Sequence, residues 1–471
     1  MDNVLCDEII QEIFMKLPSS SSSSVSLVSK RWLSLFRSSR TSLSLRLLPP
    51  FSETASLASL LSDYSSLSSL SLFISFDSAV SSTDSGVSDN ILAVVSSRCS
   101  RLRALRFMPD PVSLSSLNSL SAACTQLTSL CINLPRPISL GWVLSFPSLR
   151  ELAITWSSAG QEIDPNNQLE VWESDETDAD LGLQSLCLVG IRRGDWGVGW
   201  LWRSCNNLKK LRLQSCQGIG GPYSSFVQCL QNLEEIELRT CRSVIDGVLL
   251  HIAENCQFLN SLLVYDGGSR DGLLHFISNC RSNLQKLDLR LPLDLNNDHL
   301  SAMASNFRGL LSLRLQNCCL VTGEGLRLLG TSMASSGLEE LALINCDVVE
   351  RESGLLATLG QHLKQLRKLD LSHNEMLLDK EFISMSISCT HLNDLKLRGC
   401  KGITNVAIVS VLRSCKFLEN VDIMNCGGIE SEAIEVFVEK CPKLRRINVE
   451  ENKLSDAAKM WASNRFIEVV V

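Results

Sequence analysis

Cysteine is the residue type in this chain best suited to chemistry. The 471-residue sequence contains nineteen cysteines and six histidines. A thiolate can act as a nucleophile, a zinc ligand or half of a disulfide, and each role needs its own spacing. Here there is no CxxC pair and no cysteine and histidine cluster of zinc type. Two series instead recur at intervals of 24 to 27 residues: Cys205, Cys229, Cys256 and Cys280, then Cys389, Cys415 and Cys441. Such spacing indicates a repeated structure. We therefore expect no catalytic residue, no metal site and no cofactor.

A leucine phrase, LxxLxL, repeats with the cysteines. Its fifteen copies, some with conservative apolar replacements such as Ile236 and Val421, are mostly 25 to 28 residues apart. They begin at Leu67, Leu102, Leu127, Leu149, Leu183, Leu208, Leu233, Leu259, Leu284, Leu310, Leu338, Leu366, Leu392, Leu418 and Leu444. Three residues after the last apolar position stands a cysteine in six copies, and Asn374 and Asn452 replace it in two others. This is the LxxLxLxxN/C signature of leucine-rich repeats.

Each repeat predicts a strand, a loop and an amphipathic helix. Strand alternation buries the outer residues of LxL and exposes the middle one, while helical spacing marks a buried stripe such as Ile434, Phe437, Val438 and Cys441. One repeat cannot bury both faces alone, so stacking is required. The predicted fold is α/β: a curved solenoid of about fifteen repeats with a parallel concave sheet and helices on the convex side. The corner cysteines then serve as small buried donors to the backbone.

One stretch interrupts the period. The segment SSAGQEIDPNNQLEVWESDETDADLG carries eight carboxylates and no basic residue, and five of the eight tryptophans lie in it or beside it. An acidic run is usually a solvated loop, and a binding role stays open. Helix alignment predicts that Trp202 is buried and that Trp196 and Trp200 are exposed.

Composition excludes several classes of function. The net charge is -7 and the pI is about 5.6, so the basic footprint of a nucleic-acid binder is absent. The opening MDNVLCDEIIQEIF is acidic and amphipathic, unlike a secretory signal. No run of about 18 uncharged apolar residues predicts a membrane span. We expect an intracellular protein of the nucleus or cytoplasm, without nucleic-acid or membrane partners.

A different pattern precedes the repeats. The run VLCDEIIQEIFMKLP has helical apolar spacing ended by Pro18, and VSLVSKRWLSLFRSS follows a serine tract with a second apolar stripe. Two or three short helices in about 45 residues can barely bury a core. The module should therefore need a partner or the solenoid to be stable.

These residues resemble an F-box. The run LxxEIIxEIFxxLP followed by SLVSKRWLSL, joined to cysteine-containing leucine-rich repeats, is similar to the F-box/LRR proteins, in a plant-like form. The resemblance implies a non-catalytic substrate-receptor subunit of a Skp–cullin–F-box ubiquitin ligase, with a Skp-type adaptor, and through it cullin and RING subunits, as partners. By motif match, the adaptor contact or the F-box core would use Leu5, Ile9, Ile10, Ile13, Leu17, Pro18, Val28 and Trp32.

The predicted domains follow from both patterns. They are the F-box at 1–46, a linker and N-terminal cap at 47–66, repeats at 67–452 with the acidic insert at 157–182, and a C-terminal cap at 453–471, where Phe466 to Val471 supply a last strand.

The target surface is predicted on the strands. Middle strand positions are small in the early repeats, such as Cys131, Ala153 and Cys187, and charged in later ones. We expect a target protein to contact four arginines, because guanidinium groups bind carboxylate or phosphate through two hydrogen bonds: Arg212, Arg239, Arg290 and Arg314. A merely soluble strand face is the alternative. For the whole chain, the alternatives are a ligase-independent interaction scaffold and a co-receptor for a small molecule.

Overall fold

The structure, a computed structural model, describes most of the chain and divides it into two compact units. It describes residues 5–17, 24–25, 27–47, 54–74, 85–136, 139–157, 179–192, 195, 197–219, 225–292, 294–335 and 337–471. The N-terminal unit comprises Met1–Gly218 and Ser224–Cys229, and the C-terminal unit comprises Ile219–Tyr223 and Leu230–Val471.

The described part of the N-terminal unit begins with helices and continues with alternating strands and helices. In chain order its elements are α1 (Asp7–Lys16), α3 (Lys30–Ser39), β1 (Ser42–Leu47), α4 (Thr54–Ser62), β2 (Ser69–Ile74), α5 (Ser85–Arg98), β3 (Ala104–Met108), α6 (Leu114–Ala123), β4 (Ser129–Leu134), the 3-10 helix η2 (Gly141–Ser145), β5 (Glu151–Trp156), β6 (Ser185–Val189), α7 (Val198–Ser204) and β7 (Lys210–Gln214). The 3-10 helix η3 (Ser225–Leu230) follows.

The C-terminal unit repeats the same alternation more regularly. Its elements are β8 (Glu235–Arg239), α8 (Ile245–Asn255), β9 (Ser261–Tyr265), α9 (Arg270–Asn279), β10 (Lys286–Arg290), α10 (Asn297–Asn306), β11 (Ser312–Gln316), α11 (Gly323–Met333), β12 (Glu340–Ile344), α12 (Asp347–Arg351), α13 (Leu355–His362), β13 (Lys368–Asp370), α14 (Asp379–Ser386), β14 (Asp394–Lys396), α15 (Asn405–Ser414), β15 (Asn420–Asp422), α16 (Ser431–Lys440), β16 (Arg446–Asn448), η4 (Glu451–Lys453), α17 (Asp456–Asn464) and β17 (Glu468–Val470).

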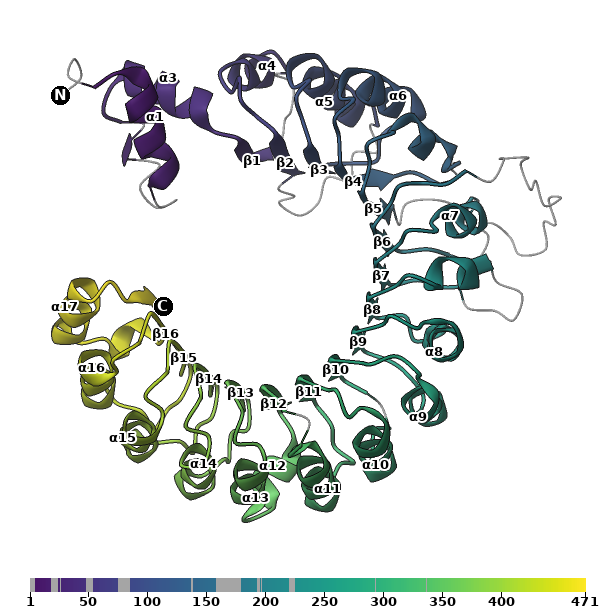
Figure 1. The fold of residues 1–471 in the computed structure, drawn as a ribbon. Helices are drawn as coiled ribbons and strands as arrows, with labels where there is room; N and C mark the ends of the chain where they lie inside the picture. Colours follow the sequence, from purple (N-terminus) through teal and green to yellow (C-terminus); the bar gives the residue numbers. More distant parts are fainter. Residues whose placement is uncertain are drawn as a thin grey trace. The chain divides into compact units, whose positions relative to one another are not determined.

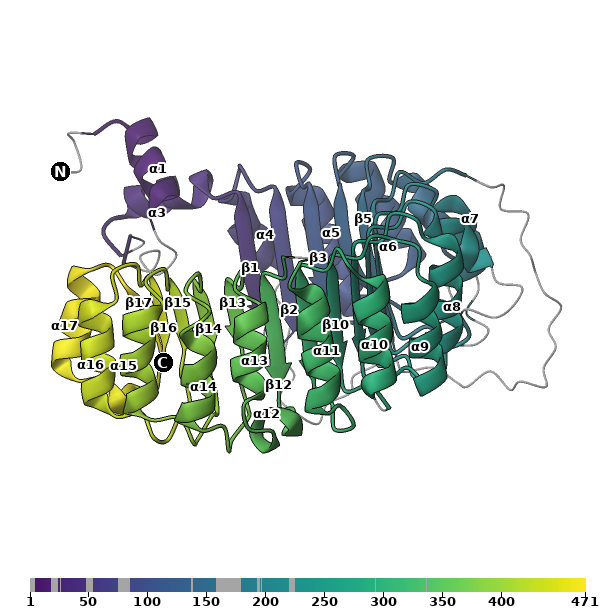
Figure 2. The ribbon, with the colours of Figure 1, turned by 60° about the horizontal axis from the view of Figure 1, so that its bottom comes forward.

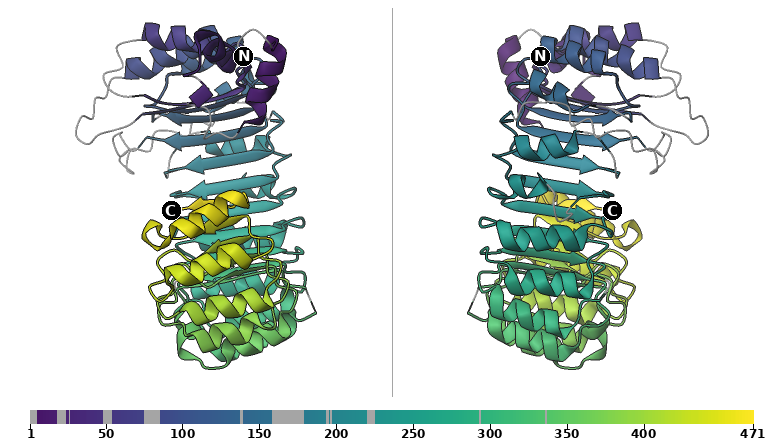
Figure 3. Two further views of the ribbon diagram at one scale, coloured as in Figure 1. Left: turned by 90° about the vertical axis from the view of Figure 1, so that its left-hand side faces the viewer. Right: turned by 90° about the vertical axis from the view of Figure 1, so that its right-hand side faces the viewer.

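Within each unit, successive strands form one layer and the helices form the other (Figure 1). Each strand pairs in parallel with the next one, as β10 does with β11 through Leu287 opposite Leu313, and the strands run parallel in side view (Figure 3). Helices of neighbouring repeats lie side by side (Figure 2). A parallel pair needs a crossover of a dozen or more residues, which a helix and its loops supply in repeats such as the one that contains α10 between β10 and β11.

The fifteen predicted strand phrases are confirmed. Every phrase begins two residues before one of the strands β2 to β16, and the strands alternate half-buried and buried residues. The outer leucines, such as Leu395 and Leu397, are 0% exposed. The predicted last strand is present as β17, parallel to β16. Strand β1 was not predicted. It pairs with β2 in parallel, so the repeat sheet begins inside the range 1–46 that the sequence assigned to the F-box.

The corner cysteines hold consecutive repeats together. Cys400 Sγ donates to the carbonyl of Leu371 (3.1 Å) and Cys426 Sγ donates to that of Leu397 (2.9 Å), in each case on the preceding repeat. All nineteen cysteines are free thiols. Burial raises the pKa of the Cys400 thiol to about 12, so it stays protonated as a donor at neutral pH. A thiol without thiolate character is neither a nucleophile nor a metal ligand, which supports the structural role.

A left-handed backbone position precedes each corner. In three repeats asparagine occupies it, at Asn317, Asn345 and Asn425, with φ of 59°, 48° and 61°. Asparagine tolerates this region well. Leu291, with φ of 51°, occupies it in another repeat. The stacking of repeats therefore imposes the turn even where the local sequence disfavours it.

One tryptophan prediction is confirmed and another is wrong. Trp202 is buried, at 3% exposed, and its ring meets Phe226 edge-on at 5.2 Å between centroids. Trp200 was expected to be exposed but is 4% exposed. The alignment with other repeats failed because α7 stands between the short 3-10 helices η2 and η3 along the chain, so this part of the helix layer is not a regular stack. Trp196 and Trp172 lie outside the described residues.

The predicted acidic insert at 157–182 also lies mostly outside the described residues. At one end of it, the Ser157 carbonyl accepts a hydrogen bond from Arg136 Nη1 (2.5 Å). The same guanidinium pairs with Asp195, Nε to Oδ1 at 2.9 Å, and both side chains are 11% exposed. Removing one partner of such a shielded ion pair would leave an uncompensated charge and destabilise the protein. The pair therefore stabilises the repeat that flanks the insert.

A buried histidine predicts a pH-dependent stability of the C-terminal unit. His299 is 0% exposed; its Nε2 lies 2.9 Å from the Arg270 carbonyl oxygen, and its Nδ1 lies 3.2 Å from the Asn296 backbone nitrogen. Burial lowers the pKa of His299 below its ordinary value of 6.5. The unfolded chain therefore takes up this proton first as pH falls, so stability should decrease below about pH 6.5, by at most about 1.4 kcal/mol per pH unit from this group.

Denaturant titrations between pH 5 and 7.5 check this prediction. His299→Gln should flatten the dependence, whereas His275→Gln, on an exposed position of α9, should leave it unchanged. An equal effect of the two variants would contradict the assignment to His299.

Candidate functional site

Helices α1 and α3, together with Val25 from the chain between them, enclose a small apolar core. Its buried residues are Ile10, Phe14 and Val25, and Leu17, Trp32, Leu35 and Phe36 pack against them. The Phe14 ring meets those of Trp32 and Phe36 edge-on, with centroids 5.4 and 5.8 Å apart. Such aromatic pairs add to simple burial. The core is thus closed by this module's own side chains.

A second set of apolar side chains on the same module faces solvent. The exposed fractions are 37% for Leu5, 48% for Ile9, 42% for Ile13 and 57% for Val28. Ile9 and Ile13 lie one turn apart on α1, where i and i+4 share a face. Solvent-exposed apolar side chains grouped on one module mark an interaction site.

The eight predicted F-box positions therefore separate into two roles. Leu5, Ile9, Ile13 and Val28 are exposed, whereas Ile10 is buried and Trp32 and Leu17 pack at the core. Pro18 lies outside the described residues. Leu27, which is 85% exposed, belongs to the same exposed set and was not predicted. The sequence offered a signal for it: Leu27 is apolar but stands directly beside Val28, so it cannot lie on the same face of a helix as Val28.

The loop before α1 is tied to α3. Arg31 Nε donates to Asp7 Oδ1 (3.1 Å), and its Nη2 donates to the Leu5 carbonyl (3.2 Å). Gln11 Nε2 donates to Ser38 Oγ (3.2 Å). These bonds fix the orientation of α1, and with it the direction in which Ile9 and Ile13 face.

The strand face of the C-terminal unit carries paired charges. Arg290 donates two hydrogen bonds to Asp288, from Nε (2.9 Å) and Nη2 (2.7 Å). Arg314 bridges Asp288 (3.6 Å) and Asp370 (3.5 Å). Arg239 Nε lies 3.0 Å from Glu237 Oε2. The hydrogen bond to Asp288 raises the pKa of Arg290.

The structure brings together some of the predicted target-binding arginines. Arg290 and Arg314 share Asp288, and Arg239 lies two strands away on β8. Arg212 belongs to the N-terminal unit, where its Nη2 donates to Gln214 Oε1 (3.0 Å). Each of these guanidinium groups already has a partner. An incoming carboxylate or phosphate would therefore exchange with an internal partner, which favours ligands that offer two acceptors at once.

The strand face of the N-terminal unit has a different character. Cys131, Ala153 and Cys187 lie opposite one another on β4, β5 and β6. Cys131 Sγ lies 3.5 Å from Met108 Sδ, and the Arg106 guanidinium lies 5.3 Å from the centroid of the Phe73 ring. The middle strand positions of this surface are thus small and uncharged at β4, β5 and β6, and sulfur atoms contribute to it.

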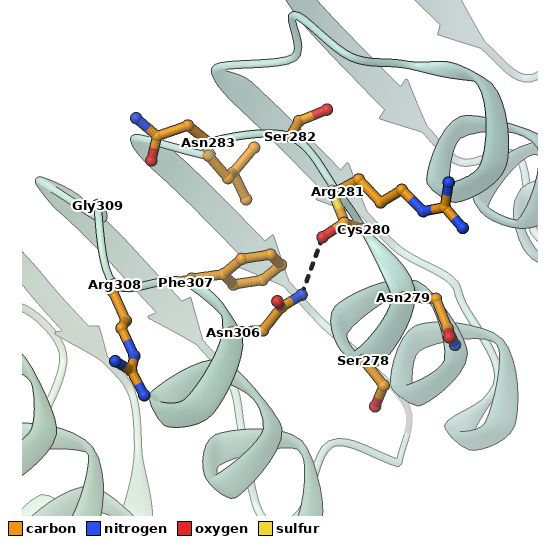
Figure 4. A pocket seen from close by; sticks show the side chains of 11 residues that line it. Ser278, Asn279, Cys280, Arg281, Ser282, Asn283, Asn306, Phe307, Arg308 and Gly309 are labelled. Carbon is orange, nitrogen blue, oxygen red and sulfur yellow. Dashed lines mark hydrogen bonds between the residues drawn. The ribbon is translucent and has the colours of Figure 1, made fainter.

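A polar groove opens between the loops that follow α9 and α10 (Figure 4). Its volume is about 520 Å³, and no carboxylate or histidine lines it. Asn306 Nδ2 donates to the carbonyls of Ile277 (2.7 Å) and Cys280 (3.0 Å), while Arg281 and Arg308 extend away from each other. Asn306 therefore satisfies carbonyl groups at the end of α9, and the groove contains no acid and base pair for catalysis.

In the part of the chain that the structure describes, histidine, cysteine, aspartate and glutamate form no group of three or more placed to hold a metal ion. The same part includes no helix with the length and apolarity to cross a membrane.

Comparisons with known proteins agree with the F-box module and with the leucine-rich repeats. The F-box domain profile matches residues 3–42. F-box/LRR-repeat protein 4 of Bos taurus is 27% identical over 163 residues, which is 34% of this chain and 26% of that protein. NLR family CARD domain-containing protein 4 of Rattus norvegicus is 25% identical over 193 residues, or 38% of this chain and 18% of that protein. The chain thus spans about a quarter or less of these relatives.

Two solved structures have lower similarity. The yeast Rad7 and Elc1 complex is 14% identical, with a TM-score of 0.48 over 94% of this chain and 92% of that one. The leucine-rich-repeat-containing protein LegL7 of Legionella pneumophila is 15% identical, with a TM-score of 0.39 over 59% and 96%. The chain therefore combines an N-terminal F-box domain with fifteen leucine-rich-repeat phrases, and part of it is similar to an F-box/LRR-repeat protein.

Proposed function

We propose that this chain is the substrate-recognition subunit of a Skp–cullin–F-box ubiquitin ligase. The observation that carries the proposal is the exposed apolar set of Leu5, Ile9, Ile13 and Val28 on a module whose core is already closed by Ile10, Phe14 and Val25. Obligate interfaces are apolar and bury about 2,000 Å² or more. Such a set fits a Skp-type adaptor, which would connect the chain to cullin and RING subunits.

The proposed mechanism needs no catalytic group in this chain. The F-box holds the adaptor, and the repeats hold a target protein on their strand faces. Linking the two raises the effective concentration of a target lysine near the charged ubiquitin carrier. We propose that the protein acts inside the cell, in the nucleus or the cytoplasm, and the many free buried thiols suit such a reducing compartment.

Co-purification of the full chain with a Skp-type adaptor tests the proposal. A stable complex of one chain with one adaptor supports it. Failure of the folded chain to bind any adaptor would instead leave a ligase-independent scaffold built on the repeats.

The proposed target contact makes a separate prediction. Replacing Arg212, Arg239, Arg290 and Arg314 with alanine should weaken capture of the target by at least about tenfold, because two-acceptor hydrogen bonds to guanidinium groups are lost. Targets are recovered by affinity capture and mass spectrometry. The matched control replaces four exposed arginines away from the strand faces, Arg101, Arg281, Arg308 and Arg413. Equal capture by both variants would remove the arginines from the target site.

A further inference from the structure

The loops that follow the helices of the last repeats carry a ladder of stacked side chains. In each of these loops a cysteine lies at or just after the end of the helix. The side chain of interest follows two residues later, and the three side chains are those of His391, Phe417 and Lys443. The rings of His391 and Phe417 stack with centroids 6.2 Å apart and planes 23° apart. Lys443 Nζ lies 4.5 Å from the centroid of the Phe417 ring. We call these three residues the ladder.

The ladder is a surface feature that the core does not explain. Phe417 is 45% exposed, and the buried leucine of each repeat comes one residue later, as Leu418 does at 0%. An aromatic ring held between a histidine and an ammonium group is ordered in solvent, which lowers the entropic cost of using it as a contact.

A second exposed aromatic residue belongs to the same edge. Phe466 is 94% exposed and has a φ of 55°, a region that costs a residue with a Cβ about 1 kcal/mol. The preceding residue, Arg465, donates to the carbonyls of Glu439 (2.9 Å), Cys441 (2.6 Å) and Pro442 (3.2 Å). Phe466 is thus presented beside the loop that bears Lys443.

A groove adjoins the ladder. It has a volume of about 520 Å³ and is lined by Glu419, Pro442, Lys443, Leu444, Arg445 and Arg465. The lining combines three basic side chains and one carboxylate with the apolar Pro442 and Leu444, and its volume offers room for a short segment of extended chain.

The charge around the groove is positive and largely uncompensated. Lys416, Lys440 and Lys443 are exposed, and among the described residues none of the three ammonium groups has a carboxylate partner, whereas Arg445 pairs with Glu419 (3.5 Å). A lysine at a helix end interacts favourably with the dipole, and Lys416 does donate to the Leu412 carbonyl (2.6 Å). That role explains neither Phe417, nor Phe466, nor Lys443, which lies beyond the end of its helix.

We propose that this surface binds an acidic peptide segment of a partner protein. Carboxylates would pair with Lys416 and Lys443, and an apolar side chain would contact Phe417 and the groove. Charge complementarity selects this occupant. The residues of this site are neither those of the exposed F-box set nor those proposed to bind a target on the strands, so the proposal does not depend on the proposed ligase function.

Fluorescence anisotropy with the full chain tests the proposal. The probe is a labelled peptide of about twelve residues that repeats Glu-Asp-Leu, a length comparable to the segments that peptide-binding grooves accept. Its partner probe repeats Gln-Asn-Leu. The wild-type chain should bind the acidic probe and not the neutral one. The double variant Lys416→Glu, Lys443→Glu should weaken binding by at least about tenfold, since two attractions become repulsions.

Two further variants make the result specific. The control Lys380→Glu, Lys459→Glu changes net charge equally at exposed lysines elsewhere in the same unit and should stay within about twofold of wild type. Phe417→Ser keeps every charge and should weaken binding about threefold to fivefold. The proposal is overturned if the control loses as much affinity as the double variant, or if the wild type ignores the acidic probe. Tighter binding to phosphatidylserine vesicles or duplex DNA than to the peptide would also overturn it.

Discussion

Replacing Ile9 and Ile13 with aspartate is expected to abolish adaptor binding while the protein stays folded. Both side chains face solvent, at 48% and 42% exposed, so the change costs little stability in the free chain. At an apolar interface each aliphatic side chain contributes about 1.5–3 kcal/mol, and burying an unpaired carboxylate adds a penalty. The loss should be at least about a hundredfold in adaptor affinity, measured by calorimetry or by co-purification.

Matched controls distinguish this effect from a general one. Leu250→Asp with Leu328→Asp places the same charges on helix positions that are 39% and 46% exposed in the C-terminal unit, and it should leave adaptor binding unchanged. Phe14→Ala should unfold the module instead, because Phe14 is 1% exposed at its core, where losing an aromatic ring costs about 3–5 kcal/mol. Retained binding by the Ile9 and Ile13 variant would refute the assigned face. The same variant should still capture targets, but those targets should no longer be ubiquitinated. That result would show that the adaptor and the target bind to different surfaces of the chain.

Asn374→Ala is expected to cause a large loss of stability in the C-terminal unit. Asn374 is 1% exposed, and its Nδ2 donates to the carbonyls of Leu343 (2.8 Å) and Leu371 (2.7 Å). Its Oδ1 accepts from the Cys346 backbone N–H (2.9 Å). Alanine would remove the partner of the Leu343 carbonyl and of the Cys346 N–H, and one of the two donors to the Leu371 carbonyl, which keeps Cys400 Sγ. We therefore expect a loss of about 3–5 kcal/mol. Denaturant unfolding and amide exchange of the neighbouring repeats measure it.

Asn374→Cys provides the informative comparison. Other repeats have cysteine at this corner with one Sγ donor to the preceding repeat, as Cys400 does to Leu371. The cysteine variant should keep part of that bond and lose about half as much stability as alanine. Asn420→Ala, at a half-buried strand position, should change stability by less than about 0.5 kcal/mol. Equal losses for alanine and cysteine at residue 374 would show that the hydrogen bonds contribute little.

The sequence alone determined the repeats and the composition of their core. Spacing placed all fifteen strands β2 to β16 and the corner cysteines, because each repeat obeys local rules: period two in a strand and a shared face every three or four residues in a helix. It also located the F-box, whose apolar residues follow the same helical rule. Strand β1 was not predicted, although Leu43, Leu45 and Leu47 alternate as in a strand. These residues directly follow the F-box helices, so they were assigned to the F-box and the linker.

Tertiary structure decided what each residue faces. Helical spacing could not tell Ile10 in the core from Ile9 at the surface, because a helix of a small module has apolar residues on two neighbouring faces and only packing against α3 selects one. The sharing of Asp288 by Arg290 and Arg314 likewise arises from strands 26 residues apart. Burial of Trp200 followed from irregular neighbours, and the left-handed turn at Leu291 followed from stacking. Periodicity specifies which residues recur at one position in a repeat, whereas the contact between two repeats depends on a pair of side chains that no single period encodes.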